Sequence, residues 1–158
     1  MAYNTSPDEK ATPPGIDARG PRVGAGITAL LLAVVILLGQ STAALVLLAV
    51  VAASFAVGAV LGTERTWQSW VYRVAVRPRL GPATEREDPR PPRFAQSVGL
   101  VITGAGVALG VAGVAVAVPI TAAIALVAAV LNAAFGLCLG CEMYLLLKRL
   151  APEHRQGR

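Results

Sequence analysis

The two cysteines of the chain lie close together near its C-terminal end, and they are the residues best suited to chemistry. Cys138 and Cys141 belong to the stretch FGLCLGCE, residues 135–142, and Glu142 follows them. In an α-helix, residues three and four apart lie on the same face. The three side chains are therefore predicted to form one patch. Cα atoms three residues apart on a helix are about 5 Å from each other, which is within the range that a disulfide spans.

Three interpretations of this patch are open from the residues alone. Buried cysteine behaves as a small apolar residue, so both side chains could simply pack in a membrane helix. A C-x-x-C pair can also form and break a disulfide with a thiol protein of the cytoplasm, a reducing compartment. A metal site is the weakest interpretation, because structural zinc takes four ligands. The chain adds only Glu142 and one histidine, His154, so we expect no metal and no cofactor.

The expected place of the cysteines in their helix predicts their reactivity. If residues 120–147 form one helix, the patch lies toward its C-terminal end, near the cytoplasmic edge of the membrane. Thiolates are favoured at helix N-termini and near cations. A helix C-terminus, apolar neighbours and the adjacent Glu142 all favour the neutral thiol. The prediction is a weakly nucleophilic pair that a partner must activate, with Glu142 tuning it or shuttling a proton.

The distribution of charge predicts the membrane domain that holds this patch. Of the 158 residues 55% are hydrophobic, and no charged residue lies between Arg22 and Glu64 or between Arg93 and Glu142. A spanning helix needs roughly 20 apolar residues, so each interval accommodates two helices and a turn. We predict an all-α integral membrane protein with four transmembrane helices in two tandem hairpins. The predicted spans are residues 23–39, 43–62, 96–117 and 120–147.

The basic residues predict the orientation. The chain has a net charge of +5. Basic residues outnumber acidic ones in the loop 63–95 and at the C-terminal end, and both turns are uncharged. The positive-inside rule then places both termini and this loop in the cytoplasm, as in a multi-pass protein of the plasma membrane. The arginines flank the bilayer, where anionic headgroups attract them, so no nucleic-acid partner is expected. Residues 1–16 are predicted to be a disordered lead and residues 151–158 a cytoplasmic tail.

An internal repeat supports the two hairpins. DARGPRV (17–23) precedes the first predicted span and DPRPPRF (88–94) precedes the third, and both read Asp-x-Arg-x-Pro-Arg-apolar. LGTE ends the second span and LGCE lies near the end of the fourth. The repeat predicts two hairpins of the same orientation, related by an axis along the membrane normal. It aligns Cys141 with Thr63, so the cysteine pair belongs to one half only.

The middle loop contains a helical apolar pattern. Trp67, Trp70, Val71 and Val74 are spaced i, i+3, i+4, i+7. Tryptophan favours the headgroup layer, so we predict a short amphipathic helix that lies on the cytoplasmic membrane surface. A docking surface for a partner is the alternative.

Two glycine pairs predict close helix contacts. Gly136 and Gly140 form a G-x-x-x-G pair in the fourth predicted span, and Gly106 and Gly110 form one in the third. Such pairs let helix backbones approach closely. On one continuous helix, the first pair would lie nearly opposite the cysteines. The cysteine patch is therefore predicted to face away from this contact.

Three stretches resemble the domain-of-unknown-function 4395 family of small bacterial integral-membrane proteins: VRPRLGP (76–82), EDPRPPRFAQSVGL (87–100) and LNAAFGLCLGCEMYLLLKRL (131–150). The resemblance extends over residues 17–150, and the F-G-x-C-x-G-C-E block is its most specific part. It implies a multi-span membrane protein in which both cysteines and Glu142 occupy matching positions. It also implies an association with thioredoxin-like and rhodanese-type sulfurtransferase proteins, which are often encoded near family members.

These observations favour a membrane component of thiol-redox or sulfur-transfer metabolism. Cys138 and Cys141 would exchange with a thioredoxin-like or rhodanese-type protein at the cytoplasmic face, and the isolated chain is not expected to be an enzyme. The alternative is a structural or transporter-accessory subunit whose cysteines only pack. The expected surroundings are the lipid bilayer, and a homo-oligomer is open.

Overall fold

The computed structural model describes residues 15–80 and 86–150. Nearly all of the predicted disordered lead, 1–16, and the whole predicted tail, 151–158, therefore lie outside the described residues. In chain order the elements are β1 (Ile16–Asp17), α1 (Arg19–Leu38), α2 (Thr42–Leu61), the 3-10 turn η1 (Thr63–Arg65), α3 (Trp67–Val71), the π-helical turn η2 (Tyr72–Val76), α4 (Arg77–Leu80), β2 (Arg86–Glu87), α5 (Arg90–Val111), α6 (Ala117–Phe135) and α7 (Leu139–Leu150).

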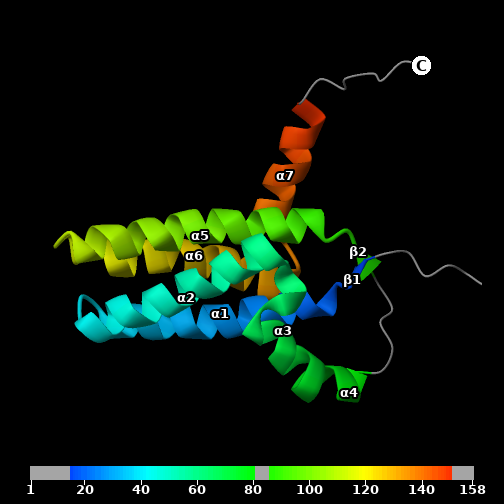
Figure 1. Cartoon of the computed structure of the whole chain (residues 1–158), viewed down its shortest axis with the longest axis horizontal. Helices are drawn as coiled ribbons and strands as arrows, with labels where there is room; N and C mark the ends of the chain where they lie inside the picture. Colours follow the sequence, from blue (N-terminus) through cyan, green and yellow to red (C-terminus); the bar gives the residue numbers. More distant parts are fainter. Residues whose placement is uncertain (1–14, 81–85, 151–158) are drawn as a thin grey trace, which may run out of the picture.

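Four long apolar helices form the body of the molecule, as the charge-free intervals predicted. α1 and α2 are 20 residues long, α5 has 22 and α6 has 19, which is enough for each to cross a membrane. They form the antiparallel hairpins α1–α2 and α5–α6 (Figure 1). Large apolar side chains cover their outer surfaces: Leu37 is 85% exposed and Val111 is 74% exposed. Such a surface suits lipid rather than water, and the four-span, two-hairpin membrane fold is confirmed.

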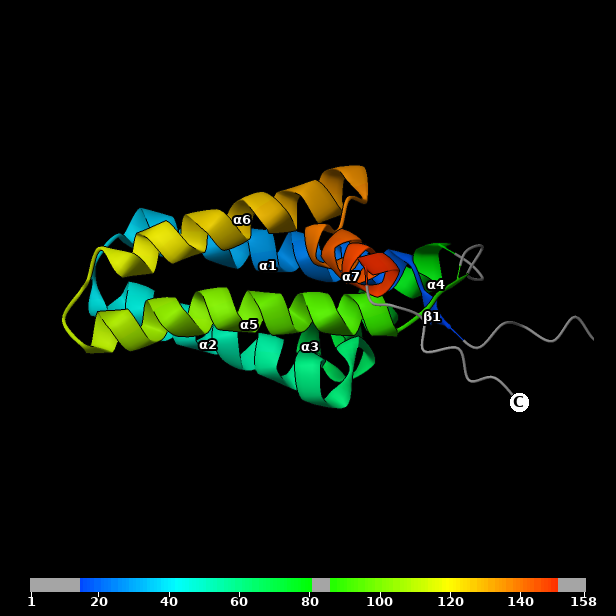
Figure 2. The ribbon, with the colours of Figure 1, turned by 90° about the horizontal axis from the view of Figure 1, so that it is seen from above.

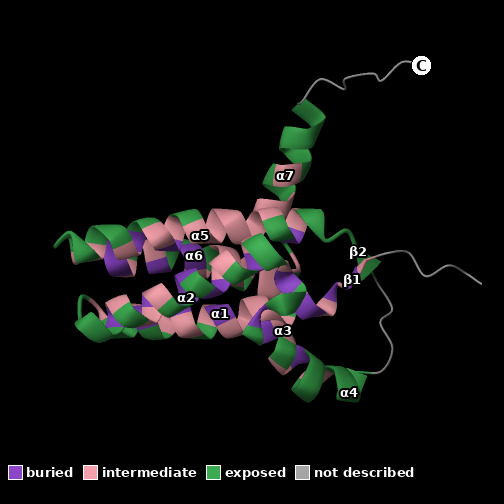
Figure 3. Ribbon diagram, in the orientation of Figure 1, coloured by how far each residue is buried: buried purple, intermediate pink, exposed green. Residues whose placement is uncertain are grey.

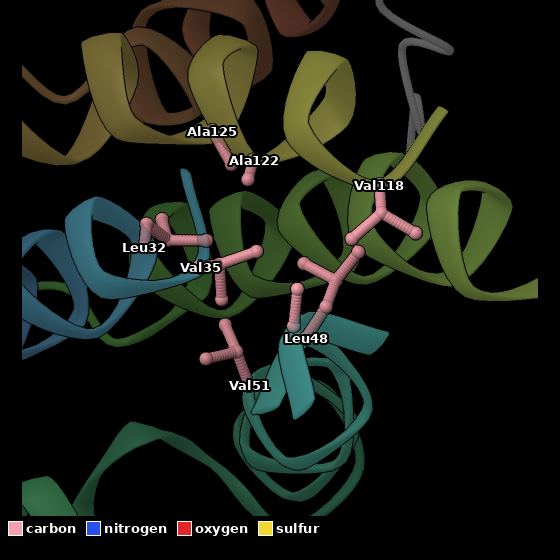
Figure 4. Close-up of a cluster of buried hydrophobic side chains, with 8 residues drawn as sticks. Leu32, Val35, Leu48, Val51, Val118, Ala122 and Ala125 are labelled. Atoms are coloured by element: carbon pink, nitrogen blue, oxygen red, sulfur yellow. The ribbon is translucent and has the colours of Figure 1, made fainter. Parts of the chain in front are cut away.

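The two hairpins pack crosswise, because α1 contacts mainly α6 and α2 contacts mainly α5. The core lies where α1, α2 and α6 meet (Figure 4). Its fully buried side chains include Leu32, Val35, Leu48 and Ala122. The predicted close contact of the third span is also present. A Cβ on Gly106 would meet Thr121, and one on Gly110 would meet Val118, so these glycines bring α5 against α6.

The beginnings of the two hairpins have the same local structure, which supports the repeat. The backbone N–H of Arg19 donates to the Asp17 carboxylate at 3.1 Å, and the N–H of Arg90 donates to that of Asp88 at 2.9 Å. β1, which contains Asp17, pairs antiparallel with β2, which directly precedes Asp88, and Ile16 lies opposite Glu87. The first hairpin is thereby joined to the second where both begin. We call this end of the bundle the charged end, because all described charged residues belong to segments there.

Equivalent arginines then connect each hairpin to the other. Arg93, at the start of α5, donates from Nε to the Ala59 carbonyl at 2.7 Å and from Nη2 to the Val60 carbonyl, at the end of α2. Arg22, its counterpart in α1, reaches the end of α6: a Cβ on Gly136 would overlap the Arg22 guanidinium. A cation at a helix C-terminus satisfies free carbonyls and complements the helix dipole.

The fourth span ends at Phe135, so the prediction of one helix over 120–147 is wrong. Gly136 has a left-handed conformation, with φ 67° and ψ 14°, and its N–H donates to the Asn132 carbonyl at 3.0 Å. This is the usual way for glycine to stop a helix. The chain turns, and α7 begins at Leu139 and leaves the bundle sideways (Figure 1).

The break also removes the basis of two predictions that assumed one continuous helix: the Gly136–Gly140 stripe, and a cysteine patch that faces away from that stripe. Gly136 and Gly140 do not form a stripe on one helix. Gly140 belongs to α7, where a Cβ would lie 2.6 Å from the Ala95 Cβ of α5, so it allows α7 to approach α5.

In the structure the two hairpins correspond at other residues than the LGTE and LGCE match suggests. The described glycines with positive φ are Gly39 and Gly62 in the first hairpin and Gly113 and Gly136 in the second, at the same spacing. Gly62 and Gly136 end the second helix of each hairpin. Cys141 therefore does not correspond to Thr63. LGTE ends a spanning helix, whereas LGCE begins a new one.

A helix outside the bundle follows each hairpin at the charged end. After α2 comes the helical segment 67–80, formed by α3, η2 and α4, and after α6 comes α7 (Figure 3). Trp70 and Val74 are each 58% exposed, whereas Gln68 is only 7% exposed. The predicted amphipathic helix is thus present, with its apolar edge facing outward and its polar edge facing the bundle.

Tyr72 attaches this segment to the start of α1. Its hydroxyl donates to the Asp17 carboxylate at 2.6 Å. Burial, and then the hydrogen bond to Asp17, raise the pKa of Tyr72 to about 12. The neutral hydroxyl is the form that fits this site, since ionisation would place two negative charges together.

Substitution of the helix-ending glycine tests the break. Gly136→Ala should destabilise the protein by roughly 1–2 kcal/mol, because alanine is strained in the left-handed region. Thermal unfolding in detergent micelles, followed by circular dichroism, measures the change. Gly104→Ala is the matched control, because Gly104 lies within α5 and nothing lies within 4 Å of its added Cβ. That substitution should be neutral or stabilising by up to about 1 kcal/mol. Stabilisation by Gly136→Ala would instead indicate a continuous helix.

Removal of the Tyr72 hydroxyl tests the attachment of the middle segment. Tyr72→Phe should cost roughly 1.5–3 kcal/mol at neutral pH, the value of a hydrogen bond to a charged group. The folded pKa of about 12 lies above the ordinary value of 10.0, so this stability is complete below pH 10 and is lost as the pH rises toward 12. Thermal midpoints of the two proteins should converge over that window. A constant difference through pH 12 would contradict the assignment.

Candidate functional site

Cys138 directly precedes α7 and occupies its N-cap position. The backbone N–H of Cys141 donates to the Cys138 sulfur at 3.3 Å, and the N–H of Glu142 donates to the Cys138 carbonyl at 3.0 Å. The cysteines therefore lie at a helix N-terminus, and their predicted place toward a C-terminal end is wrong. The physical reason is the stop at Gly136, which frees the next residues to start a helix of their own.

The structure joins Cys138 and Cys141 in a disulfide, with their Cα atoms 5.1 Å apart. This agrees with the distance expected from their spacing. Both cysteines are partly exposed, so the bond is open to attack by another thiol. Glu142 lies in the first turn of α7, where a carboxylate is favourable for the helix dipole. The three predicted site residues are thus brought together, although on a different helix from the one expected.

The first half of the molecule holds a hydroxyl pair in the corresponding place. Thr66 is the N-cap of α3, and its Oγ1 accepts from the Ser69 N–H at 3.3 Å, the same contact that Cys138 makes with Cys141. The two hydroxyls also hydrogen-bond to each other at 3.1 Å. T-x-x-S in one half therefore makes the same N-cap contact as C-x-x-C in the other, although Thr66 is four residues after Gly62 and Cys138 is two residues after Gly136. Matching LGTE with LGCE concealed this shared contact, which is visible only at the first capped helix after each hairpin.

A cavity of about 790 Å³ lies at the charged end and contains both pairs in its wall. Figure 2 shows α5 and α6 diverging toward the end where α7 begins. The wall includes Phe55 and Ile102 on its apolar side, together with many small residues of α5 and α6. The polar side chains that line it are Arg22, Thr28, Thr63, Thr66, Gln68, Ser69, Glu87, Asp88, Gln96, Asn132 and Glu142. Its size is typical of sites for small molecules.

The electrostatic surroundings of Cys138 favour a thiolate once the disulfide is reduced. The negative Cys138 sulfur would accept a hydrogen bond from the Cys141 N–H and lie at the positive end of the α7 dipole. The Arg22 guanidinium lies against Gly136, two residues away in the chain. The prediction of a weakly nucleophilic pair assumed that the cysteines lie at a helix C-terminus. They lie at an N-terminus, so the main premise of that prediction does not hold. The adjacent Glu142 carboxylate has the opposite effect and favours the neutral thiol, as the sequence indicated.

Gln68 is a site residue that the sequence pattern did not reveal. It lines the cavity and is only 7% exposed, and its Oε1 has no hydrogen-bond partner among the described residues. A buried polar atom without a partner costs free energy that a bound donor would recover. Gln68 falls outside the apolar stripe of the middle segment, so the pattern gave it no role. No group of three or more His, Cys, Asp or Glu side chains suited to a metal occurs in residues 15–80 and 86–150.

The family model described as Domain of unknown function (DUF4395) matches residues 16–149. The chain belongs to the DUF4395 family. The match includes all four spanning helices, the middle segment and nearly all of α7, so the disulfide and the cavity lie within the family region. Neither the curated proteins nor the solved structures gave a match to this chain.

The capping geometry predicts which cysteine of this DUF4395 protein is the nucleophile. After reduction, Cys138 should react with iodoacetamide several-fold faster at neutral pH than Cys141, because only its sulfur receives a helix N–H. The single-cysteine variants Cys141→Ser and Cys138→Ser separate the two rates, measured by mass spectrometry. Both keep the backbone N–H at position 141. Equal rates, or a faster Cys141, would contradict the assignment.

Proposed function

We propose that this DUF4395 protein is a membrane-bound thiol–disulfide exchange protein that acts at the cytoplasmic face of the plasma membrane. One observation carries the proposal: a C-x-x-C disulfide caps a helix N-terminus in the wall of an open cavity. A pair that served packing alone would not require a helix start, partial exposure and a cavity together. The orientation follows from the basic residues of the charged end and from the uncharged turns at the other end.

The exchange uses Cys138 as the attacking sulfur and Cys141 as the resolving one. The Cys138 thiolate attacks a partner disulfide, forms a mixed disulfide and releases one partner thiolate, which takes up a proton. Cys141, after loss of its proton, attacks Cys138, re-forms the internal disulfide and releases the second partner thiol. Counted from the neutral dithiol, the cysteine pair loses two electrons and two protons, one of them in the ionisation of Cys138, and the partner gains two of each. The reverse sequence oxidises a partner dithiol through the same mixed disulfide.

The same two cysteines would also process a sulfane sulfur. Attack of the Cys138 thiolate on the terminal sulfur of a partner persulfide transfers that sulfur and releases the partner thiolate. Attack by Cys141 on Cys138 then forms the disulfide and releases hydrosulfide. Glu142, in the first turn of α7, would exchange protons with the sulfurs in either reaction. A thioredoxin-like protein suits the first reaction and a rhodanese-type protein suits the second.

The charged end supplies surfaces for such a partner. α7 leaves the bundle next to the disulfide, and Leu146 and Leu147 are more than half exposed. Lys148 and Arg149 follow in its last turn. This helix would either lie in the headgroup layer or contact the partner while the disulfide faces the cytoplasm.

Trapping of a mixed disulfide tests the proposal. In Cys141→Ser the partner should remain attached through Cys138, because the resolving thiol is missing. Cells that produce this variant should yield a mixed disulfide with a thioredoxin-like or rhodanese-type protein, identified by mass spectrometry after non-reducing electrophoresis.

Cys138→Ser is the matched control and should capture much less, since Cys141 lacks the N–H contact. The double variant, with both cysteines replaced by serine, should capture nothing at the same protein level. A structural or accessory subunit would give no captured thiol protein from any variant, and that result would refute the exchange function.

A further inference from the structure

The cavity beside the disulfide has the properties of a binding site for a membrane-soluble molecule. Residues of the spanning helices α1, α5 and α6 form much of its wall, with Phe55 of α2. Ile124 and Val127 line it and are 53% and 59% exposed, so it is not sealed from the surface of the bundle. That surface is the apolar one which faces lipid. A ligand dissolved in the bilayer would therefore reach the cysteines without passing through water.

The polar groups of the wall narrow the chemistry of this ligand. The Gln68 Oε1 is buried without a partner among the described residues and needs a hydrogen-bond donor. Arg22 and Asn132 offer donors to an acceptor. A suitable ligand has an apolar body with oxygen atoms that accept in one state and donate in another. The Cys138–Cys141 pair adds the requirement that the ligand exchange two electrons.

We propose that the cavity binds a lipid-soluble quinone, which accepts electrons from the Cys138–Cys141 dithiol. This inference rests on the proposed exchange function and names the second substrate of the same site. A quinone combines a flat apolar ring with two carbonyl oxygens, and its reduced form carries two hydroxyls. The quinone carbonyls accept hydrogen bonds from Arg22 and Asn132, and in the quinol a hydroxyl donates to the Gln68 Oε1.

The electron count of the two reactants matches. Oxidation of the dithiol breaks two S–H bonds and forms one S–S bond, with release of two electrons and two protons. Reduction of the quinone takes up two electrons and forms two O–H bonds. One quinone therefore restores one disulfide, which then accepts electrons from a dithiol of the soluble partner. The net reaction oxidises the partner and produces one quinol.

Quinone reduction by the pre-reduced protein tests this proposal. The full chain is placed in phosphatidylcholine vesicles, reduced, freed of reductant and mixed with decylubiquinone. Loss of the quinone absorbance and loss of maleimide-reactive thiols are followed together. We expect one quinol for each disulfide formed. Cys138→Ser should form no disulfide and no stoichiometric quinol.

Two pairs of variants separate a bound quinone from one that merely collides with the thiols. Ala128→Phe places a ring in the cavity wall, and Ala123→Phe makes the same change on an exposed part of α6 outside it. At low quinone concentration, Ala128→Phe should slow the reaction by about tenfold or more, because its ring fills space in the pocket and even one methylene there changes rates by that factor. The second should leave the rate within about twofold, a difference too small to indicate a lost binding contact.

Gln68→Met provides an independent readout, because it removes a polar atom that the protein itself leaves without a partner. Its thermal midpoint should stay unchanged or rise, while the quinone concentration that gives half the maximal rate should increase. Gln96→Met, which alters another amide of the cavity wall, is the control and should shift this concentration less.

The outcomes distinguish the two proposals. Equal rates for wild type, Ala128→Phe and Ala123→Phe would overturn quinone binding, and so would thiol loss without quinol. If the cysteines then still exchange with a soluble dithiol protein, the exchange function stands and only the acceptor is wrong. If the protein forms one quinol for each disulfide but traps no thiol protein, the quinone site stands and the soluble partner is refuted.

Discussion

The left-handed glycine that ends α6 is the constraint on which the site depends. With any backbone that continued the helix at Gly136, the N–H of Cys141 would bond within that helix and Cys138 would have no free donor. The stop uses a conformation that costs other residues about 1–2 kcal/mol, and it occurs beside the Arg22 guanidinium. A single backbone torsion thus converts the end of a spanning helix into the start of a new one, with its positive dipole end at the sulfur atoms.

This device occurs twice, because the two hairpins repeat each other. Gly62 and Gly136 end their second helices, equivalent arginines reach these ends, and a capped helix follows each. The capping pair differs, with Thr66 and Ser69 in one half and cysteines in the other, and the turn η1 separates Gly62 from the capped helix in the first half. The scaffold therefore does not need sulfur at this position, since hydroxyls cap a helix at least as well. The cysteines are the chemical specialisation of one half, facing the same cavity as their hydroxyl counterparts.

The parts of the fold that depend on bilayer thickness and charge could be predicted from the sequence. Charge-free intervals had to contain two spans each, and the Asp-x-Arg-x-Pro-Arg repeat marked the beginnings of both hairpins. The break in the last span was missed because FGLCLGCE continues the apolar pattern, and a glycine in such a run also suits helix packing. Composition cannot distinguish those two uses of Gly136; only φ does.

Gln68 escaped prediction for a different reason. In a water-soluble protein the apolar edge of a helix faces the core, so a polar residue off that edge is assigned to solvent. At the membrane surface the apolar edge faces lipid, and the polar edge is the one turned toward the protein. Trp70 and Val74 are accordingly exposed while Gln68 and Tyr72 are buried. Polar residues of such a helix are therefore the ones that reach a cavity inside the bundle. The same inversion explains why a chain with so few polar side chains in its spans still surrounds its disulfide with hydrogen-bonding groups.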